Sequence, residues 1–349
     1  MNPTAAPGSN PDPASIATAV RLLEAGALVA FPTETVYGLG ADAENPEAVR
    51  RIYRAKQRPE NHPLIVHLAP EADVGYWSSA VGPAAQKLMA AFWPGPLTLI
   101  LARAVHIPDT VAGGQQSIGL RSPSHPVAQA LLRGFKAGRG GIAAPSANRF
   151  GHVSPTTASH VRDEFRDSPL LTCILDGGQS TVGIESTILD LSRGRPVLLR
   201  PGQVSAAQIA ACLGELPGLP DTAAPRASGT MASHYAPQAP VATLPAAQLA
   251  AVIVQLTARG HRLALMDYSG SVDAGPLAIA RHVRLPHDAV RYAHDLYATL
   301  RQLDRADIDL ILIESLPVYD AWQAVNDRLG RAAYGSVAML EKMLATPMM

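Results

Sequence analysis

Three segments of the chain carry polar and charged side chains at unusual density, each where a short apolar run begins or ends. The first is residues 31–43 (FPTETVYGLGADA), joined through one predicted helix to residues 53–68; the others are residues 116–126 (QSIGLRSPSHP) and 141–156 (GIAAPSANRFGHVSPT). In open α/β folds, ligands bind beyond the strand ends, where loops supply polar groups. We therefore expect the three segments to bring their side chains to one cleft.

Cationic side chains in and near these segments suit a ligand with several negative charges. Lys56 and Arg58 form a K-x-R pair at the end of a predicted helix, and Arg200 ends a later apolar run. Phosphate groups are bound by such cations together with hydroxyl and amide donors. The candidate donors are Ser117, Ser146, Asn148 and Ser154. Arg121, at a strand end, could hold a carboxylate with two parallel hydrogen bonds.

The sequence leaves structural roles open for the same residues. Lys56 and Arg58, at a helix end, could simply favour the helix dipole. Arg121 could be a surface ion-pair partner, and Ser146 and Asn148 could cap a helix or a turn.

Common catalytic signatures are absent from the sequence. It contains no GxxxxGK[ST] phosphate loop, no HExxH, no CxxC pair and no GxSxG elbow. The runs 38–40 (GLG) and 138–141 (GRGG) are too short for a dinucleotide fingerprint and are typical of plain turns. Asp42 and Glu34 are acids within the first polar segment, and surface or helix-capping roles suit them equally well. No dense carboxylate cluster indicates a permanent metal site.

Length and composition favour a two-domain protein of the cytoplasm. The chain has 349 residues, of which 47% are hydrophobic and 17% charged, and 29 basic residues balance 29 acidic ones. A net charge of zero argues against a general binder of nucleic acid or membrane surfaces. Cys173 and Cys212 lie in apolar surroundings and are predicted to be buried free thiols. No apolar run is long enough to span a membrane, and residues 1–12 resemble a short disordered tail rather than a signal peptide.

Hydrophobic periodicity positions the polar segments on a mixed α/β domain over residues 13–215. Short runs rich in branched residues and bounded by Gly or Pro predict strands, and longer amphipathic stretches between them predict helices. The predicted strands are 27–31, 64–68, 97–102, 118–120, 170–175, 186–191 and 196–200, and the predicted helices are 14–25, 46–56, 83–92, 126–135 and 156–165.

A second α/β domain is predicted over residues 246–345, after a linker at 216–245 that is dense in Pro, Ala, Gly and Ser. Its first two elements are AVIVQL and RLALMDYSG, the latter a strand. A helix over 287–305, a buried strand over 309–317 and a further helix through Trp322 follow. This alternation predicts a small parallel sheet with crossover connections.

The motifs together resemble the YrdC/Sua5 family. The resemblance rests on PTETVYGLGAD, PLIVH, WPGPLT, IGLR, and PSAN followed by SPT, with Lys56, Arg58, Ser146 and Asn148 as the family's K-x-R … S-x-N signature. SHYAP (233–237) and the second domain are similar to the longer, Sua5-type members. Two positions depart from the family pattern: His62 stands where Asn is common, and Gln57 where Gly is common.

The resemblance implies a fold and an activity. It implies a YrdC-like catalytic domain with a concave cleft, a smaller Rossmann-like second domain, and a nucleotidyltransferase. The implied reaction converts L-threonine, bicarbonate or CO2 and ATP with Mg²⁺ to threonylcarbamoyl-AMP and pyrophosphate. The product would serve tRNA t6A modification through other, threonylcarbamoyl-transferring proteins; whether this chain touches tRNA itself is left open.

Site residues follow from the same resemblance. Lys56, Arg58 and His67 are the candidate catalytic residues. ATP is expected to meet Lys56, Arg58, His62, Ser117, Ser146, Asn148, Ser154, Arg200, His234 and Tyr235, and threonine to meet Thr35, His67, Arg121, the main chain of Ala144, and Ser186. We hypothesise that His67 orients or deprotonates the threonine amine, although it could instead be a satisfied core histidine.

SHYAP lies in a linker with no helical or strand face for His234 and Tyr235 to pack into. We hypothesise that the linker folds over the nucleotide site as a lid, with a passive spacer as the alternative.

Two other functions remain as alternatives for the chain. One is an RNA-binding or ribosome-assembly module, which the zero net charge weakens. The other is a carbamoyl-transfer enzyme of the hydrogenase-maturation type, which would need zinc-finger cysteines that this chain lacks.

Overall fold

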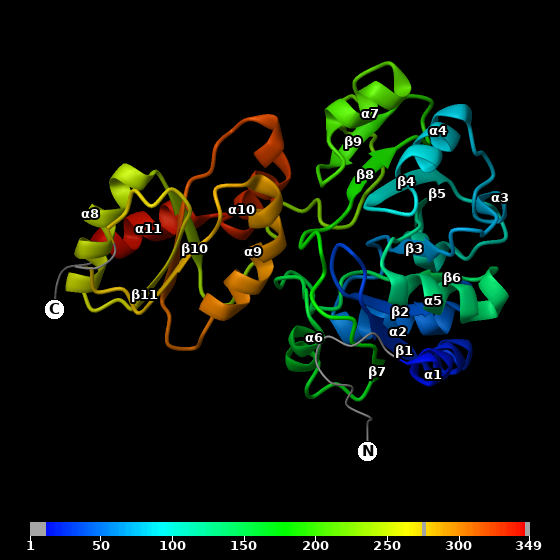
Figure 1. Cartoon of the computed structure of the whole chain (residues 1–349), viewed down its shortest axis with the longest axis horizontal. Coiled ribbons are helices and arrows are strands. Elements are labelled where there is room, and N and C mark those ends of the chain that lie inside the picture. The colour runs from blue at the N-terminus through cyan, green and yellow to red at the C-terminus, as the bar shows by residue number, and fades with distance from the viewer. Residues whose placement is uncertain (1–11, 274–276, 346–349) are drawn as a thin grey trace. The chain divides into compact units, whose positions relative to one another are not determined.

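The chain forms two compact units in a computed structural model that describes residues 12–273 and 277–345 (Figure 1). The first unit extends to Phe150 and includes Ser154–Thr230; the second includes Gly151–Val153 and the chain from Met231 onward. The chain thus passes from one unit to the other within the predicted linker. The predicted tail lies outside the described residues except for Asp12, which caps the first helix by accepting a hydrogen bond from the Ser15 amide at 2.7 Å.

The first unit is built on a nine-stranded mixed sheet in the order β7-β1-β2-β6-β3-β5-β4-β8-β9. Its strands are β1 (Leu28–Phe31), β2 (Gly38–Asp42), β3 (Ile65–Leu68), β4 (Leu97–Ala102), β5 (Ser117–Arg121), β6 (Gly141–Ala143), β7 (Leu171–Ile174), β8 (Thr187–Asp190) and β9 (Val197–Arg200). Strands β3 and β5 are parallel, whereas β6 runs antiparallel to both β2 and β3. The mixed α/β class predicted for this part of the chain is confirmed.

Both faces of strand β1 are buried. Along β1, Leu28 and Ala30 join one apolar cluster while Val29 and Phe31 join another, as the two-residue period of a strand requires. A strand buried on both faces has a continuous apolar sequence, which is why ALVAF was recognisable. The helices of this unit are α1 (Pro13–Glu24), α2 (Pro46–Lys56), α3 (Val74–Trp77), α4 (Pro83–Phe92), α5 (Pro126–Gly134), α6 (Ala158–Glu164) and α7 (Ala206–Leu213), with 3-10 turns at Asp109–Ala112 and Phe135–Gly138.

The glycine-rich runs predicted as plain turns lie partly in the sheet. Residues 38–40 begin β2, and Gly141 begins β6. A Cβ at Gly40 would stand 2.8 Å from the Phe31 ring and 2.9 Å from the Ile142 side chain. Glycine is therefore needed at position 40 for close packing across the sheet rather than for turn formation, and the turn prediction was wrong there.

The second unit contains a four-stranded parallel sheet in the order β10-β13-β11-β12. Its strands are β10 (Val241–Leu244), β11 (Leu263–Asp267), β12 (Arg281–Arg284) and β13 (Leu310–Glu314), and its helices are α8 (Ala246–Ala258), α9 (Ala289–Leu303), α10 (Gln323–Ala332) and α11 (Ser336–Ala345), with a 3-10 turn at Asp320–Trp322. The predicted small parallel sheet is confirmed. AVIVQL lies in helix α8, and β10 forms from the end of the predicted linker.

Two smaller sequence expectations can also be compared with the structure. Cys173 and Cys212 are free, as predicted, but only partly buried. Over residues 12–273 and 277–345, every helix is too short or too polar to cross a bilayer.

Candidate active site

Arg121, at the end of β5, lies beside the PTET loop that joins β1 to β2. Its Nη1 donates to Thr35 Oγ1 at 2.9 Å, its Nε donates to the Gly95 carbonyl at 3.2 Å, and its Nη2 forms an ion pair with Glu34 Oε1 at 2.8 Å. Arg121 and Glu34 are 4% and 5% exposed. A guanidinium presents N–H donors whose geometry matches a carboxylate. The alternative that Arg121 pairs with a surface acid is excluded, because its partner Glu34 is itself buried.

His67 of β3 is the direct neighbour of Arg121 in the parallel β3–β5 pair. Burial lowers the pKa of His67 to about 3, and the charge of Arg121 contributes in the same direction. The imidazole is therefore neutral at physiological pH, and with so low a pKa it is a weak proton acceptor. This argues against the hypothesis that His67 deprotonates the threonine amine and leaves it an orienting role.

Ser186, just before β8, lies in a buried hydrogen-bond network with Arg200 at the end of β9. Arg200 Nε and Nη2 donate to the Ser186 carbonyl at 3.1 and 2.9 Å, and the Ser186 hydroxyl lies 2.8 Å from Thr98 Oγ1. The Ala144 amide donates to the Ile65 carbonyl at 2.9 Å. Any main-chain contact from Ala144 to a ligand would therefore use its carbonyl.

Lys56, the last residue of α2, points into the protein rather than toward solvent. Its ammonium donates to the main-chain carbonyls of Ser146, at 2.6 Å, and Asn148. The Lys56 carbonyl in turn accepts a hydrogen bond from the Phe150 amide at 2.8 Å. Burial, followed by the charge of Arg58, lowers the pKa of Lys56 well below its usual value. Lys56 thus joins both halves of the K-x-R … S-x-N signature.

Arg58 and His62 surround the aromatic ring of Phe150. The Arg58 guanidinium lies 5.6 Å from the Phe150 ring centroid and donates to the Pro63 carbonyl at 2.9 Å. The His62 ring meets Phe150 edge to face at 5.1 Å. Burial, together with the charge of Arg58, lowers the pKa of His62. Since His62 is half-buried and neutral, a contact with an anionic ligand would depend on hydrogen bonding rather than on charge.

Ser154 is fully buried and bonded to an acid that the sequence reasoning missed. Its hydroxyl donates to Glu185 Oε1 at 2.5 Å. Glu185 also influences Lys56 electrostatically, which places an acid close to the predicted phosphate-binding cations. The sequence signal that could have identified Glu185 is its position directly before Ser186, in the same polar stretch that precedes strand β8.

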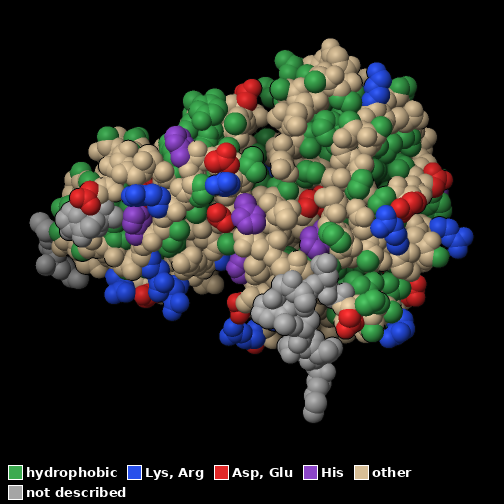
Figure 2. All heavy atoms as spheres, viewed as in Figure 1, with side chains coloured by type: hydrophobic (Ala, Val, Ile, Leu, Met, Phe, Trp, Pro, Cys, Tyr) green, Lys and Arg blue, Asp and Glu red, His purple; other side chains and the backbone are tan. Residues whose placement is uncertain are grey.

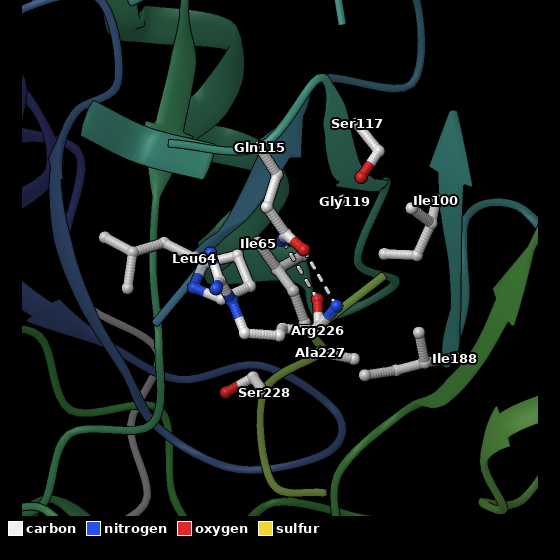
Figure 3. Close-up of a pocket in the computed structure, with 11 residues that line it drawn as sticks. Leu64, Ile65, Ile100, Gln115, Ser117, Gly119, Ile188, Arg226, Ala227 and Ser228 are labelled. Atoms are coloured by element: carbon white, nitrogen blue, oxygen red, sulfur yellow. Dashed lines mark hydrogen bonds between the residues drawn. The ribbon is translucent and has the colours of Figure 1, made fainter. Parts of the chain in front are cut away.

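A pocket in the first unit lies between β3, β4, β5 and β8 and is shown in Figure 3. Ile65, Ile100 and Ile188 supply apolar walls, and Ser117 supplies a hydroxyl. The pocket is covered by residues 226–228 of the predicted linker (Arg226, Ala227 and Ser228), which we call the pocket cover.

Hydrogen bonds hold this stretch in place. Arg226 Nη2 donates to the Gly113 carbonyl at 2.9 Å, and Gln115 Oε1 accepts from the Arg226 amide at 2.8 Å. Arg200 Nη1 donates to the Ser228 carbonyl at 2.7 Å. The predicted cation Arg200 therefore links the pocket cover to the Ser186 network.

His234 and Tyr235 have a packing environment, contrary to the expectation from the sequence. Tyr235 is buried in the second unit, where its ring stacks on Tyr297 of α9 at 5.7 Å and lies 5.3 Å from the Arg328 guanidinium of α10. The His234 amide donates to the Arg331 carbonyl at 3.3 Å. A structural role therefore accompanies any nucleotide contact at these residues.

Family models match both units. Residues 21–202 match the family model Sua5_yciO_yrdC, whose description reads "Telomere recombination", and residues 204–334 match Sua5_C, described as "Threonylcarbamoyl-AMP synthase, C-terminal domain".

Relatives and a solved structure span nearly the whole chain. Threonylcarbamoyl-AMP synthase of Pyrococcus abyssi (strain GE5 / Orsay) is 38% identical, covering 91% of this chain and 94% of its own. The protein of the same name in Bacillus subtilis (strain 168) is 39% identical, with 94% and 95% covered. The crystal structure of P. abyssi Sua5 complexed with L-threonine has a TM-score of 0.83 at 34% identity, covering 94% of this chain and 96% of that chain. The chain therefore belongs to the Sua5/YciO/YrdC family, as its motifs predicted, and carries the Sua5-type C-terminal domain.

Proposed function

We propose that this chain condenses L-threonine with bicarbonate or CO2 and ATP, giving threonylcarbamoyl-AMP and pyrophosphate for tRNA t6A modification in the cytoplasm. The observation that carries the proposal is the buried Arg121–Glu34 pair beside neutral His67, in the same unit as the buried cations Lys56, Arg58 and Arg200. The first set suits a free amino acid and the second a polyphosphate. The relatives named for this activity and the P. abyssi structure with L-threonine support the pairing.

The reaction needs no nucleophile from the protein. Bound threonine first loses its ammonium proton to water. The neutral amine then attacks the carbon of bicarbonate, expelling water, or of CO2, releasing a proton, and forms a carbamate. A carbamate oxygen attacks the α-phosphorus of ATP, and pyrophosphate leaves with the electrons of the broken P–O bond. The contribution of the protein is orientation and charge neutralisation, and orientation alone supplies up to about 7–11 kcal/mol. Arg121 would hold the threonine carboxylate, leaving the amine directed toward the carbon source.

Magnesium enters this account with the nucleotide. The described residues contain no group of three or more His, Cys, Asp or Glu side chains placed to hold a metal ion. Mg²⁺ bound to ATP keeps phosphate and water ligands and takes only one or two carboxylates from a protein. Glu185, which is buried and accepts a hydrogen bond from Ser154, is the carboxylate that we assign to that contact.

The segment that covers the pocket would limit water at the reacting anhydride. Residues 226–228 lie over apolar walls and are held by Arg200, one of the proposed phosphate-binding cations (Figure 3). Arg200 contacts both Ser186 and Ser228. Nucleotide binding at Arg200 would therefore alter the hydrogen bond that fixes residues 226–228 over the pocket. This retains the lid hypothesis for the part of the linker that lies in the first unit.

Pyrophosphate release tests the proposed activity. Purified chain with ATP and Mg²⁺ should release pyrophosphate only when threonine and bicarbonate are both present. Release without threonine would contradict the reaction order. If release is absent and the chain instead binds RNA with a steep salt dependence, the RNA-binding alternative is favoured. The interspersed basic and acidic side chains on the face in Figure 2 give no continuous basic surface for that alternative.

Arg226→Ala tests the cover. Loss of the side-chain hydrogen bond to the Gly113 carbonyl should raise the KM for ATP and increase hydrolysis of the product by water, while the main-chain bonds to Gln115 remain. Arg195→Ala is the matched control, since Arg195 is an exposed arginine paired with Asp221 away from the pocket. Equal kinetics for the two variants would show that the segment is a passive spacer.

A further inference from the structure

The deepest part of the candidate site contains polar atoms that are buried but not hydrogen-bonded. Among residues 12–273 and 277–345, they include both carboxylate oxygens of Glu34, Nη2 of Arg121 and Nδ1 of His67. Arg121 Nη2 and Glu34 Oε1 are 2.8 Å apart as an ion pair, yet their orientation is not that of a hydrogen bond. His67 is the strand neighbour of Arg121, so the three side chains form one group.

An arrangement of this kind is unfavourable for folding. Leaving one buried donor or acceptor without a partner costs about 1–3 kcal/mol, and more when the group is charged. Native proteins bury few such groups, and each one calls for an explanation, such as a role in catalysis or binding or a contact with water or an ion. The other two nitrogens of Arg121 that donate hydrogen bonds, Nε and Nη1, have good acceptors in Gly95 and Thr35. Within this group, the atoms of Glu34 and Arg121 that lack hydrogen bonds are therefore those that face each other.

A free amino acid supplies the missing partners. In the threonine zwitterion, the carboxylate and the ammonium are attached to the same carbon, so a complementary site needs a cation and an anion side by side. Arg121 supplies the cation, and Glu34 supplies an acceptor-only anion, whose Oε1 is ion-paired with Arg121 and whose oxygens accept no hydrogen bond in this structure. His67 Nδ1 remains for the β-hydroxyl, which would account for all three residues at once.

We propose that Glu34 recognises the α-ammonium group of threonine and so makes the site specific for an amino acid over a hydroxy acid. This deepens the proposed function and rests on it. Glu34 lies between Thr33 and Thr35, whose hydroxyls are 2.9 Å apart and fixed by the Val36 carbonyl, which accepts from Thr33 Oγ1 at 2.7 Å. The loop that carries Glu34 is thus held rigidly, as a recognition group requires.

The competing explanation is that Glu34 only orients Arg121. In that case its loss would weaken every ligand that bears a carboxylate. If Glu34 binds the ammonium, its loss would weaken only ligands that have one. (R)-3-hydroxybutyrate separates the two explanations, because it keeps the carboxylate and the β-hydroxyl of threonine and lacks the amine.

The experiment compares L-threonine with (R)-3-hydroxybutyrate by titration calorimetry on the full chain, for wild type and Glu34→Gln. Wild type should bind threonine at least tenfold more tightly. Glu34→Gln should lose about tenfold to a hundredfold in threonine affinity and keep its affinity for (R)-3-hydroxybutyrate within about threefold. Equal weakening of both ligands, or weakening of neither, overturns the proposal.

Controls keep the test decisive. Glu71→Gln, at an exposed glutamate paired with Arg133, should leave both affinities unchanged. Should Glu34→Gln fail to fold, Glu34→Asp keeps the charge but withdraws it by one methylene, and selective weakening of threonine is still expected. Equal binding of the two ligands by wild type overturns the proposal without any variant.

Threonine-dependent pyrophosphate release by wild type is measured first. If release is absent, the proposed function is rejected. If release is present but Glu34→Gln weakens both ligands equally or neither, only the role of Glu34 is rejected.

Discussion

Two buried carboxylates that lie next to arginines, Asp267 in the second unit and Glu34 in the first, are satisfied differently. In the second unit, Asp267 at the end of β11 is fully buried and accepts hydrogen bonds from Arg284, at 3.1 Å, and His282, at 2.9 Å. Glu314 at the end of β13 accepts from two main-chain amides, those of Tyr268 and Ser269. In the described part of the first unit, Glu34 faces Arg121 with neither oxygen hydrogen-bonded.

The difference separates structural charge from charge kept for a ligand. Parallel α/β sheets commonly bind ligands at the carboxyl ends of their strands, so position alone would single out Asp267 and Glu314. Their lone pairs are already used by neighbouring donors in the same unit, which is how a buried carboxylate is stabilised in a fold. Among the buried carboxylates of the described residues, a lack of hydrogen bonds therefore singles out Glu34, which its place in the sheet does not.

The largest expected effect comes from Arg121→Gln. Removing the cation leaves the Glu34 charge buried and unpaired and removes the proposed carboxylate contact. Threonine-dependent pyrophosphate release, measured as kcat/KM for threonine, should fall at least a hundredfold. Arg284→Gln makes the same substitution at the half-exposed arginine of the second unit and should stay within about twofold of wild type. Similar losses for the two variants would remove the contrast between the units.

Asp267→Asn tests the structural half of the comparison. The amide keeps the size of the carboxylate but weakens its charge-assisted bonds to Arg284 and His282, so unfolding should become easier by about 1.5–3 kcal/mol. Urea unfolding measures the change in free energy, and titration with threonine should show an unaltered dissociation constant. A weakened threonine affinity with unchanged stability would assign Asp267 to a ligand instead.

His67 should make the first unit sensitive to acid. Its pKa of about 3 in the folded protein lies below the ordinary value of 6.5 that applies to the unfolded chain, so between these values the unfolded chain binds more protons. Stability contributed by His67 is therefore complete above pH 6.5 and lost as the pH falls toward 3. From pH 6.5 to 5 the loss should be about 2 kcal/mol. His67→Gln, which cannot be protonated, should lose that much less stability over the same range; identical pH profiles would contradict the assignment.

The smallest effect is expected at Gln57, where the family commonly has glycine. Gln57 directly follows α2 as its C-cap and has φ = 53°, a left-handed conformation that glycine adopts without steric penalty. Gln57→Gly should raise the free energy of unfolding by up to about 1 kcal/mol without changing substrate affinity. Gln57→Ala keeps the steric penalty and should give no gain. Stabilisation by alanine would mean that the glutamine side chain, rather than the backbone, is unfavourable.

The predictions from sequence succeeded where the signal was local. β4 and β13 were recognisable because their apolar runs contain branched residues and are bounded by turn formers. β2 and β6 were missed because Gly38, Gly40 and Gly141 are typical of turns, whereas the tertiary packing of Phe31 and Trp77 requires glycine there. Local signals carry no information about a neighbour that is distant along the chain.

The candidate site shows the same limit. The polar strand ends identified most of the residues that the structure brings into the first unit, since they belong to recognisable motifs. The pairing of Glu34 with Arg121 and of Ser154 with Glu185 could not be predicted, because each joins segments that are far apart in the sequence. Tyr235 was read as lacking a packing surface for the same reason: its partners Tyr297 and Arg328 lie on helices much later in the chain.

The most direct test of the proposed reaction follows the carbon atom that joins the two substrates. Wild-type chain is incubated with ¹³C-bicarbonate, ATP, Mg²⁺ and L-threonine, and the products are analysed by mass spectrometry. The account predicts one labelled molecule that contains both threonine and AMP and that disappears when any substrate is omitted. Pyrophosphate released in a threonine-dependent manner without that labelled adduct, as from an unlabelled threonyl-AMP, would contradict it.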